Sequence, residues 1–402
     1  MRRDPLDYLS RELESLAQQG LYRHLRILDG EQSHKSTFDH RQVVNLSSNN
    51  YLGLTTHPKL RQAALDATRT LGVGSGSVRT IAGTMDIHME LERRLAAFKK
   101  TEAVVVFQSG FAANAGTVAA VLTKDDVVVS DELNHASIID GSRLSRATIK
   151  VFPHKDVDGA RKILKELPAS QRKLLITDGV FSMDGDLGAL PELCQVAEEF
   201  GCIMMVDDAH ASGVFGANGR GTVDHFGVHG RVDIQVGTLS KAIGALGGYV
   251  AGSKALIEFL YHRARPFLFS TSHPPAVAAS CLAAIDVLEQ EPQIIERLWE
   301  NTRFFKSGLK ALGLNTGLSE SPITPVIVGE GALAMKLSDR LFEEGVFAQG
   351  IAFPTVARDK ARVRTIVTAT HTRDELQFAL DAFAKVGGEL GILKESGLGA
   401  RG

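Results

Sequence analysis

The chain has 402 residues, a formal net charge of -2 and a charged fraction of 23%. It contains neither a long block of like charges nor an apolar run of about 18 residues, so we expect no nucleic-acid partner and no membrane segment. A chain this long exceeds what one hydrophobic core usually serves, which predicts a large domain with smaller terminal parts. Cys194, Cys202 and Cys281 fall within apolar patterns, which is typical of buried free thiols in a reducing compartment and predicts a cytoplasmic protein without a metal site.

Residues 1–57 are predicted to form an N-terminal arm. Between residues 5 and 19 leucines recur at helical spacing, and Gly20 ends the pattern. This amphipathic helix differs from the apolar segment of a signal peptide, and its leucine stripe needs another surface to cover it. The arm ends in turn-like residues 47–53. There the Asn49 side chain either stabilises the turn or directs its amide to a ligand.

Residues 58–290 are predicted to form a large α/β domain. It opens with a helix over 58–71 and a glycine-rich loop over 72–80, which is either a linker or a ligand-approach loop. Six short apolar segments then alternate with helical patterns, which predicts a mostly parallel sheet covered by helices on both faces. The predicted strands are 103–107, 127–130, 174–177, 203–206, 234–237 and 248–252, with helices at 111–122, 191–200 and 254–263.

Residues 291–402 are predicted to form a smaller C-terminal α+β domain. The helical patterns there are longer, at 294–312 and 333–344, and strands are expected near 324–328 and 362–367.

The first strand-to-helix junction, residues 108–114, is a candidate phosphate cradle. Gly110 allows close backbone approach, and free N–H groups at the start of the following helix favour a dianion. The segment does not match the dinucleotide fingerprint, and Lys99 and Lys100 do not complete a nucleotide-binding loop. A plain helix-start glycine is the alternative.

Asp207, His210 and Lys241 carry the strongest chemical signal. Asp207 follows the apolar segment 203–206, His210 comes three residues later, and Lys241 follows the next predicted strand. A strand-end acid and such a lysine suit a cofactor that needs a carboxylate for a ring nitrogen and an amine for a Schiff base, as pyridoxal phosphate does. The alternative is a helix-capping aspartate and a surface lysine.

Two further histidine signals stay open. His135 also follows a strand, where an imidazole either forms structural hydrogen bonds or stacks on a planar ring. His225 and His229 have the spacing of metal ligands on a helix, but Gly227 between them and the lack of a third ligand argue against a metal.

Taken together, these segments resemble the α-oxoamine synthases, the fold-type I enzymes that use pyridoxal 5′-phosphate (PLP) to condense an amino acid with an acyl-CoA. The matching segments run in the family's order over nearly the whole chain: 48–53, 83–84, 134–141, 178–185, 206–210, 237–241 and 362–364. The resemblance implies a PLP-dependent acyltransferase with a fold-type I α/β architecture. It also implies a homodimer with shared active sites.

The resemblance implies specific residue roles. Lys241 would form the Schiff base, Asp207 would pair with the pyridine nitrogen, His135 would stack on the ring, and His210 with Ser182 would address the 3′-oxygen. Backbone at Gly110 and Phe111, with Thr238 and Ser240, would take the phosphate, while Ser270 and Thr271 would reach the phosphate of the neighbouring subunit. Asn49, His135, Thr355 and Arg364 would bind the substrate, with Arg364 rather than Arg362 on its carboxylate.

Two members of the family compete as the closest match. Residues 77–79 and 265–270 favour 2-amino-3-ketobutyrate CoA ligase, which joins glycine to acetyl-CoA, and 8-amino-7-oxononanoate synthase, which joins alanine to pimeloyl-CoA in biotin biosynthesis, is the alternative. An enzyme that serves both reactions, and a PLP aminotransferase or lyase without an acyl-CoA substrate, remain open. A regulator built on the same scaffold would be expected to lack the lysine or to carry a DNA-binding region, and neither applies here.

Overall fold

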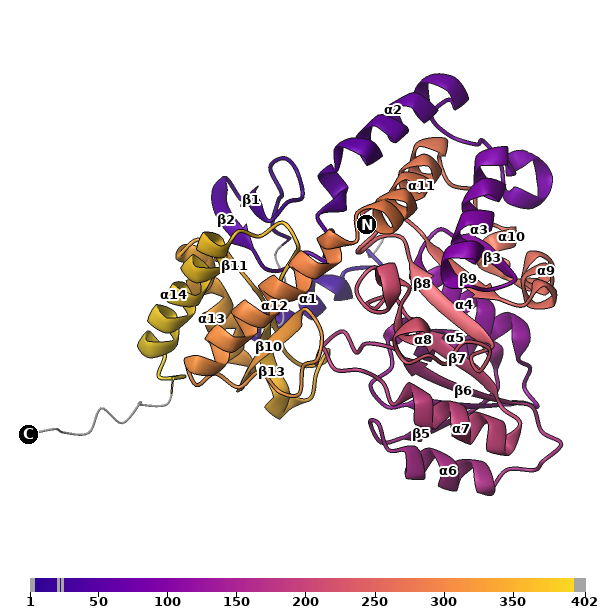
Figure 1. The fold of residues 1–402 in the computed structure, drawn as a ribbon. Helices are drawn as coiled ribbons and strands as arrows, with labels where there is room; N and C mark the ends of the chain where they lie inside the picture. The colour runs from indigo at the N-terminus through magenta and orange to yellow at the C-terminus, as the bar shows by residue number, and fades with distance from the viewer. Residues whose placement is uncertain (1–3, 20–21, 23–24, 394–402) are drawn as a thin grey trace, which may run out of the picture.

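The computed structural model describes residues 4–19, 22 and 25–393, and Figure 1 shows two lobes of unequal size. Gly20, the expected end of the N-terminal helix, lies outside the described residues, as do residues 394–402 of the expected C-terminal domain.

The larger lobe contains a seven-stranded sheet in the order β3-β9-β8-β7-β6-β4-β5. Four neighbouring pairs, from β8 to β5, are parallel, and β9 runs antiparallel to both β8 and β3. The strands are β3 (Ala103–Phe107), β4 (Val127–Asp131), β5 (Thr148–Phe152), β6 (Lys173–Asp178), β7 (Ile203–Asp207), β8 (Ile234–Thr238) and β9 (Gly248–Gly252). The predicted mostly parallel sheet is therefore confirmed, and all six predicted strands lie in it.

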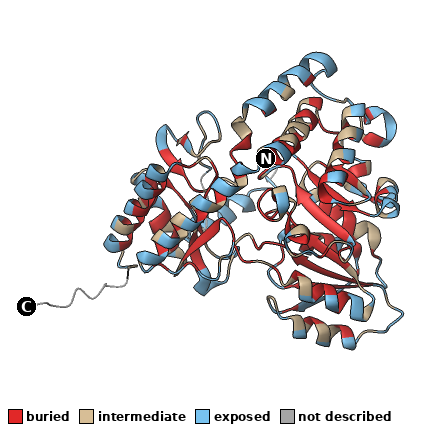
Figure 2. Cartoon of the chain, in the orientation of Figure 1, coloured by how far each residue is buried: buried red, intermediate tan, exposed pale blue. Residues whose placement is uncertain are grey.

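Helices cover both faces of this sheet because successive strand side chains point to opposite sides. Val128 packs in one cluster with α4 (Gly110–Val121), α5 (Ala136–Ser145), α9 (Lys254–Arg263) and α10 (Arg265–Leu268). Val127 and Val129 pack in another with α6 (Val157–Lys165), α7 (Leu190–Phe200) and α8 (Thr222–His225). A third cluster joins β3 and β9 to α3 (Asp86–Lys99) and α11 (Pro275–Gln290), and α2 (Pro58–Leu71) contacts α11. In Figure 2 the buried residues accordingly concentrate in the strands and on the inner sides of the helices.

The α7–β7 connection shows how the sequence delivers one acid to the sheet edge. Pro191 occupies the first turn of α7, where its missing N–H costs nothing, and Gly201 ends the helix with φ 60°. That turn lets the Cys202 N–H donate to the Ala197 carbonyl at 2.8 Å. The apolar β7 then runs through the core and ends at Asp207.

The smaller lobe is built on two three-stranded sheets. One has the order β10-β13-β12, from β10 (Ile323–Gly329), β13 (Ala361–Ile366) and β12 (Gln349–Ile351), and is antiparallel throughout. The other has the order β1-β2-β11, from β1 (Lys35–Phe38), β2 (Arg41–Asn45) and β11 (Val346–Phe347). Helices α12 (Gln293–Ala311), α13 (Gly331–Glu343) and α14 (Arg373–Glu389) complete this lobe.

The N-terminal segment is only partly helical. Helix α1 (Tyr8–Gln18) contains no buried residue, but β2 pairs in parallel with β11 from the other end of the chain. Residues 35–45 thus lie beside the C-terminal elements in Figure 1. The domain boundaries at 57/58 and 290/291 stay predictions. Within the part of the chain that the structure describes, no helix is both long and apolar enough to cross a membrane.

Candidate active site

A cavity of about 200 Å³ lies at the carboxyl ends of β6, β7 and β8, where the ends of parallel strands leave room for a ligand. Its lining joins residues from widely separated segments: Ser109, Gly110, Phe111, His135, Ser137, Asp178, Val180, Asp207, Ala209, His210, Thr238, Ser240 and Lys241. All four predicted catalytic residues are in this set, as are the four predicted phosphate-binding residues.

One end of the cavity is built to hold an anion. Helix α4 begins at Gly110, and the Ser109 side chain caps it by accepting from the Ala112 N–H at 3.0 Å. The first N–H groups of a helix have no partner within the helix, and the helix dipole favours negative charge there. Opposite this turn, the Thr238 and Ser240 hydroxyls lie 2.8 Å apart. Two hydroxyls and a helix N-terminus therefore face one end of the cavity.

The carboxylate of Asp207 is held rigidly at the floor of the cavity. Its Oδ2 accepts from the Asn114 side-chain amide at 2.6 Å, and its Oδ1 accepts from the Ala209 N–H at 2.8 Å. The same Asn114 amide donates to the Ser137 hydroxyl at 2.9 Å. Asp207 is 5% exposed, so this carboxylate has a fixed direction and little access to water.

Asp178 lies beside Asp207 because β6 and β7 pair these two residues directly. Burial and the neighbouring Asp207 charge raise the pKa of Asp178 well above its ordinary value. Ionising two neighbouring carboxyl groups in a buried site is unfavourable because their negative charges repel, so one of the two keeps its proton. We therefore take Asp178 to be protonated.

His135 and Lys241 complete the reactive part of the cavity. The His135 Nδ1 lies 2.7 Å from the Ser137 hydroxyl, which fixes the ring, and burial lowers the pKa of this imidazole. Burial also lowers the pKa of Lys241 from its ordinary 10.5 to about 8, against the opposing attraction of Asp207. A buried amine with this pKa is available as a nucleophile and base near neutral pH.

His210 lines the cavity but has a partner that the sequence did not point to. Its Nδ1 lies 2.7 Å from the hydroxyl of Tyr51, a fully buried residue 159 positions earlier in the chain. Burial lowers the pKa of His210 well below its ordinary value, and the Lys241 charge adds to this effect. His210 is therefore a neutral imidazole.

The structure separates the two arginines of β13. Arg362 is 3% exposed and donates to the Asp184 carboxylate at 2.6 Å and to the Met183 carbonyl at 2.9 Å. Arg364 donates to the Ser182 carbonyl at 3.2 Å, and its guanidinium lies close enough to Lys241 and His210 to lower the pKa of both. Arg362 is thus committed to an ion pair, whereas Arg364 faces the site.

Six predicted site residues lie outside the cavity lining, and Arg364, described above, is one of them. Ser182 offers its carbonyl to Arg364, and Asn49 has a buried Oδ1 without a hydrogen-bond partner among the described residues. Thr271 forms an isolated bridge with Val78, and its carbonyl accepts from Gln108 at 2.7 Å, with Ser270 beside it. Thr355 is exposed on the 352–358 loop of the smaller lobe. The described chain therefore does not bring Ser270, Thr271 or Thr355 to the cavity.

Sequence reasoning missed several residues of the site. Asn114, Ser137, Asp178 and Tyr51 all belong to segments that carried the family resemblance or the phosphate-cradle argument, but no role was assigned to them. The signal that could have found Asn114 is its position one helical turn after Gly110, where a polar side chain would otherwise be costly to bury.

Comparison with known proteins decides the family. The aminotransferase class I and II family matches residues 41–383. An 8-amino-7-oxononanoate synthase of Symbiobacterium thermophilum is 62% identical over 96% of this chain and 99% of the relative, and one of Bacillus subtilis is 55% identical over 96% and 99%. The chain belongs to the class I and II aminotransferase family.

Solved structures of this family have the same fold. A Sphingomonas wittichii serine palmitoyltransferase aligns with a TM-score of 0.93 at 32% identity, over 97% of this chain and 100% of that one. An 8-amino-7-oxononanoate synthase of Francisella tularensis aligns with a TM-score of 0.74 at 28% identity, over 86% and 98%. With its synthase relatives, this member of the aminotransferase family is an α-oxoamine synthase, a PLP-dependent acyltransferase with a fold-type I architecture.

The cavity of this family member fits PLP at three points. The α4 N-terminus with Thr238 and Ser240 suits the phosphate, the fixed Asp207 carboxylate suits a protonated pyridine nitrogen, and the amine of Lys241 suits the aldehyde carbon. His135 lines the same space as an imidazole that can lie against the ring.

The open histidine and cysteine questions have structural answers. His229 Nε2 lies 3.0 Å from Asp224, whereas the His225 ring packs against Phe215 and Phe226. Among the described residues, no group of three or more histidines, cysteines or acids could hold a metal ion. Cys194 and Cys281 are buried free thiols, as predicted, and Cys202 is a partly buried one.

Proposed function

We propose that this enzyme condenses alanine with pimeloyl-CoA to form 8-amino-7-oxononanoate. The observation that carries this proposal is the agreement between the 62% and 55% identical relatives, both named for that synthase. The α-carbon of alanine loses its proton and forms a bond to the thioester carbonyl, and the C–S bond breaks to release CoA. The alanine carboxyl group then leaves as CO2, and the α-carbon takes up a proton in its place.

The relatives do not support the first interpretation of the sequence, a 2-amino-3-ketobutyrate CoA ligase. Residues 77–79 and 265–270 favoured 2-amino-3-ketobutyrate CoA ligase, but the relatives support the alternative better. In the structure one residue from each segment serves the fold: Arg79 is 8% exposed and pairs with the buried Glu92 at 2.8 Å, under Phe267. Such a core ion pair does not discriminate between acyl chains.

The chemistry divides between cofactor and protein. When bound, PLP supplies a ring that accepts electrons from the α-carbon of the amino acid. Asp207 keeps the ring nitrogen protonated, because its carboxylate is fixed by Asn114 and Ala209. Lys241 accepts the α-proton at Nζ, for which a pKa of about 8 suits a base at neutral pH. The neutral His210, held by Tyr51, offers a hydrogen bond toward the ring oxygen.

Arg364 binds the amino acid carboxylate in this proposal. A guanidinium can form two parallel hydrogen bonds to a carboxylate, and this one is half-buried next to Lys241. Burial lowers the pKa of Arg364, and an incoming carboxylate would supply a negative partner for it. Asn49, with its unpartnered buried Oδ1, is assigned to the substrate side of the same site.

The active unit in this proposal is a homodimer with shared sites. Helix α1 exposes Leu9, Leu13 and Leu16 by 39–50%, a stripe that a second copy could cover. Phe269, next to Ser270 and Thr271, is 70% exposed. Ser270 and Thr271 do not line the cavity of their own chain, which agrees with a role in the neighbouring subunit.

One set of rate measurements tests the substrate assignment. The PLP-loaded enzyme is offered alanine or glycine with acetyl-CoA, octanoyl-CoA and pimeloyl-CoA, and CoA release is followed with a thiol reagent. The proposal expects kcat/KM to be at least about tenfold higher for alanine with pimeloyl-CoA than for any other pair. A preference for glycine with acetyl-CoA would restore the ligase reading, and transamination without thiol release would exclude both.

A further inference from the structure

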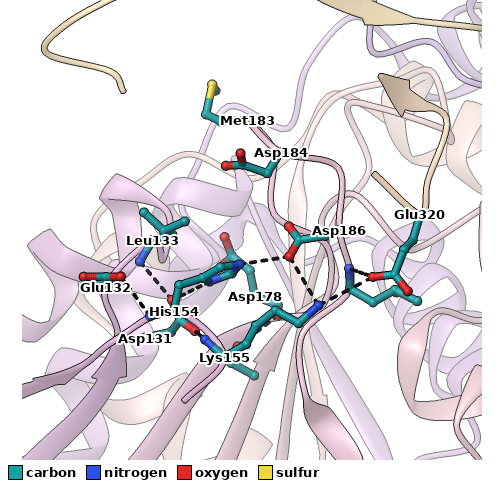
Figure 3. A network of polar contacts seen from close by, with 12 residues as sticks. Asp131, Glu132, Leu133, His154, Lys155, Asp178, Met183, Asp184, Asp186 and Glu320 are labelled. Carbon is teal, nitrogen blue, oxygen red and sulfur yellow. Dashed lines mark hydrogen bonds and ion pairs between the residues drawn. The ribbon is translucent and has the colours of Figure 1, made fainter. Parts of the chain in front are cut away.

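His154 lies between two buried carboxylates, Asp131 and Asp186 (Figure 3). Its Nδ1 is 3.1 Å from Asp131 Oδ1, and its Nε2 is 2.9 Å from Asp186 Oδ2. Asp131 and Asp186 are each 3% exposed. Phe181 covers the imidazole edge-on, with the ring centroids 4.4 Å apart.

This geometry favours a charged imidazole. An ionised carboxylate only accepts hydrogen bonds, and a neutral imidazole has one nitrogen that also only accepts. Both contacts are satisfied together when both ring nitrogens carry a proton. In agreement, the two aspartates raise the pKa of His154 to about 9 although its burial opposes this, and the His154 contact lowers the pKa of Asp186.

The imidazole joins a strand end to a loop. Asp131 ends β4, where its carboxylate also accepts from the N–H groups of Leu133 and Lys155 at 2.9 Å. Asp186 belongs to residues 179–189, which we call the 179–189 loop, between β6 and α7. Within the loop the Phe181 N–H donates to the Asp186 carbonyl at 3.0 Å, so the loop is closed on itself.

The 179–189 loop holds both arginines of β13. The Ser182 carbonyl accepts from Arg364, and the Met183 carbonyl and Asp184 carboxylate accept from Arg362. The direction of Arg364 therefore depends on where this loop lies. The loop in turn is attached to the large-lobe sheet through Asp186 and His154.

Other charged groups face the same cluster and must be counted. From the His154 segment, Lys155 Nζ lies 3.3 Å from Asp186 and 3.5 Å from Glu320, which precedes β10. Glu320 also accepts from the Leu187 N–H at 3.0 Å, and Glu132 accepts from the His154 backbone N–H at 2.9 Å. With four carboxylates and one lysine around it, the cluster has excess negative charge even with an imidazolium, and a neutral His154 would increase that excess.

We propose that His154, as an imidazolium, is a positioning residue that clamps the 179–189 loop to β4 and thereby aims Arg364 at the amino acid carboxylate. This inference rests on the proposed role of Arg364. The clamp is complete while the imidazole is doubly protonated. It opens as pH rises through the His154 titration, when the ring nitrogen facing one carboxylate loses its proton.

Direct titration tests the charge. In the PLP-loaded enzyme labelled with ¹³C-histidine, the His154 resonance is assigned by its loss in His154→Gln and followed from pH 6 to 10. We expect it to titrate near pH 9. A midpoint at or below the ordinary value of about 6.5 would overturn the proposal.

Kinetics test the positioning. Glutamine can donate in only one of the two directions, so His154→Gln should raise the amino acid KM about tenfold while kcat and the acyl-CoA KM change by less than about twofold. The matched control is His40→Gln, because the His40 side chain is 94% exposed and also pairs with an aspartate, Asp29 at 3.1 Å. It should change none of the three constants. Equal losses in kcat and both KM values for His154→Gln would indicate a merely structural role and overturn the proposal.

A second variant, Asp186→Asn, allows residue 186 to stay hydrogen-bonded to His154 even when the imidazole is neutral. In Asp186→Asn the amide can donate to a neutral Nε2, while Lys155 keeps Glu320 as a partner. The amino acid KM of wild type divided by that of Asp186→Asn should rise at least about fivefold between pH 8 and 10. Titration of Lys241 and of the amino acid is common to both proteins and cancels in this ratio. A flat ratio would overturn the proposal, and this comparison holds even if His154→Gln does not fold.

Arg364→Lys, measured in parallel, separates this inference from the function beneath it. A raised amino acid KM in Arg364→Lys without one in His154→Gln overturns the positioning role alone. An unchanged KM in Arg364→Lys overturns the proposed carboxylate site and the positioning role with it.

Discussion

At the residue scale, the amine of Lys241 combines two opposing effects. Burial disfavours its charged form, while the Asp207 carboxylate favours it, and burial is the larger effect. The folded-state pKa therefore lies below the ordinary value, and the neutral amine appears as pH rises through about 8 rather than about 10.5. Burial lowers the pKa of Lys306 in the same way, so it is the combination of this pKa with a place in the cavity lining that suits Lys241 to the chemistry.

The cofactor-free enzyme should consequently bind PLP covalently with a rate that rises through about pH 8, because only the neutral amine attacks the aldehyde. Stopped-flow absorbance of the cofactor band measures this rate. Lys241→Ala should show no covalent band and no turnover. Lys306→Ala is the matched control, because burial also lowers the pKa of Lys306 to about 8, but that amine is held by Ser319 and Ser321 in the smaller lobe. A band of normal intensity in Lys241→Ala would contradict the assignment.

Substitutions of the two arginines of β13 should have different effects, one on substrate binding and the other on stability. Arg364→Lys should raise the amino acid KM strongly, by tenfold or more, since an ammonium cannot form two parallel hydrogen bonds. Arg362→Lys should instead lower the melting temperature, because it weakens a buried ion pair with Asp184 and a bond to the Met183 carbonyl. Steady-state kinetics and thermal unfolding of both variants check this. A larger KM effect for Arg362→Lys would reverse the assignment.

At the element scale, the start of α4 serves both the fold and the ligand. Ser109 caps the helix, and the amides of Gly110 and Phe111 line the cavity. A frayed helix end would lose its stability contribution and would scatter the N–H groups that face the anion.

Ser109→Ala should therefore cost about 1 kcal/mol of stability and weaken PLP affinity about fivefold. Ser253 caps α9 in the same way, accepting from the Leu256 N–H at 3.2 Å, but α9 does not reach the cavity. Ser253→Ala should lose a similar amount of stability with unchanged PLP affinity, measured by denaturant unfolding and equilibrium dialysis. Equal PLP affinity in the two variants would remove α4 from the phosphate site.

At the scale of the whole molecule, the single chain leaves part of the predicted site unassembled. Ser270 and Thr271 do not line the cavity, and the leucine stripe of α1 is uncovered. A two-fold dimer would use the same surfaces on both copies. It could therefore cover both stripes and supply both missing residues together.

Mixing two inactive variants tests the shared site. One carries Lys241→Ala, and the other carries Ser270→Glu with Thr271→Glu. In a mixed dimer with shared sites one site receives both lesions and the other receives none, so random re-association should restore about a quarter of all sites. Verified mixed dimers without recovered activity would show that each site is built within one chain.

The sequence by itself determined six of the seven strands of the large sheet and most of the reactive residues, whereas the mostly exposed edge strand β5 was not predicted. Apolar runs that end in Asp207 and Thr238 predict buried strands, and parallel strands place their carboxyl ends at one edge. His135, Lys241 and the α4 N-terminus follow from the same local rule. These features depend on short stretches of chain, which is why patterns of a few residues were enough to find them.

Only the tertiary structure decided which distant groups meet. Side-chain alternation places Arg362 and Arg364 on one face, so it could not separate them, whereas the 179–189 loop did by supplying Asp184 to one and the Ser182 carbonyl to the other. The bonds from Tyr51 to His210 and from Asn114 to Asp207 span 159 and 93 positions, and β2 pairs with β11 across the chain. Such contacts depend on how whole elements pack, because the same local pattern is compatible with many partners until the core is assembled.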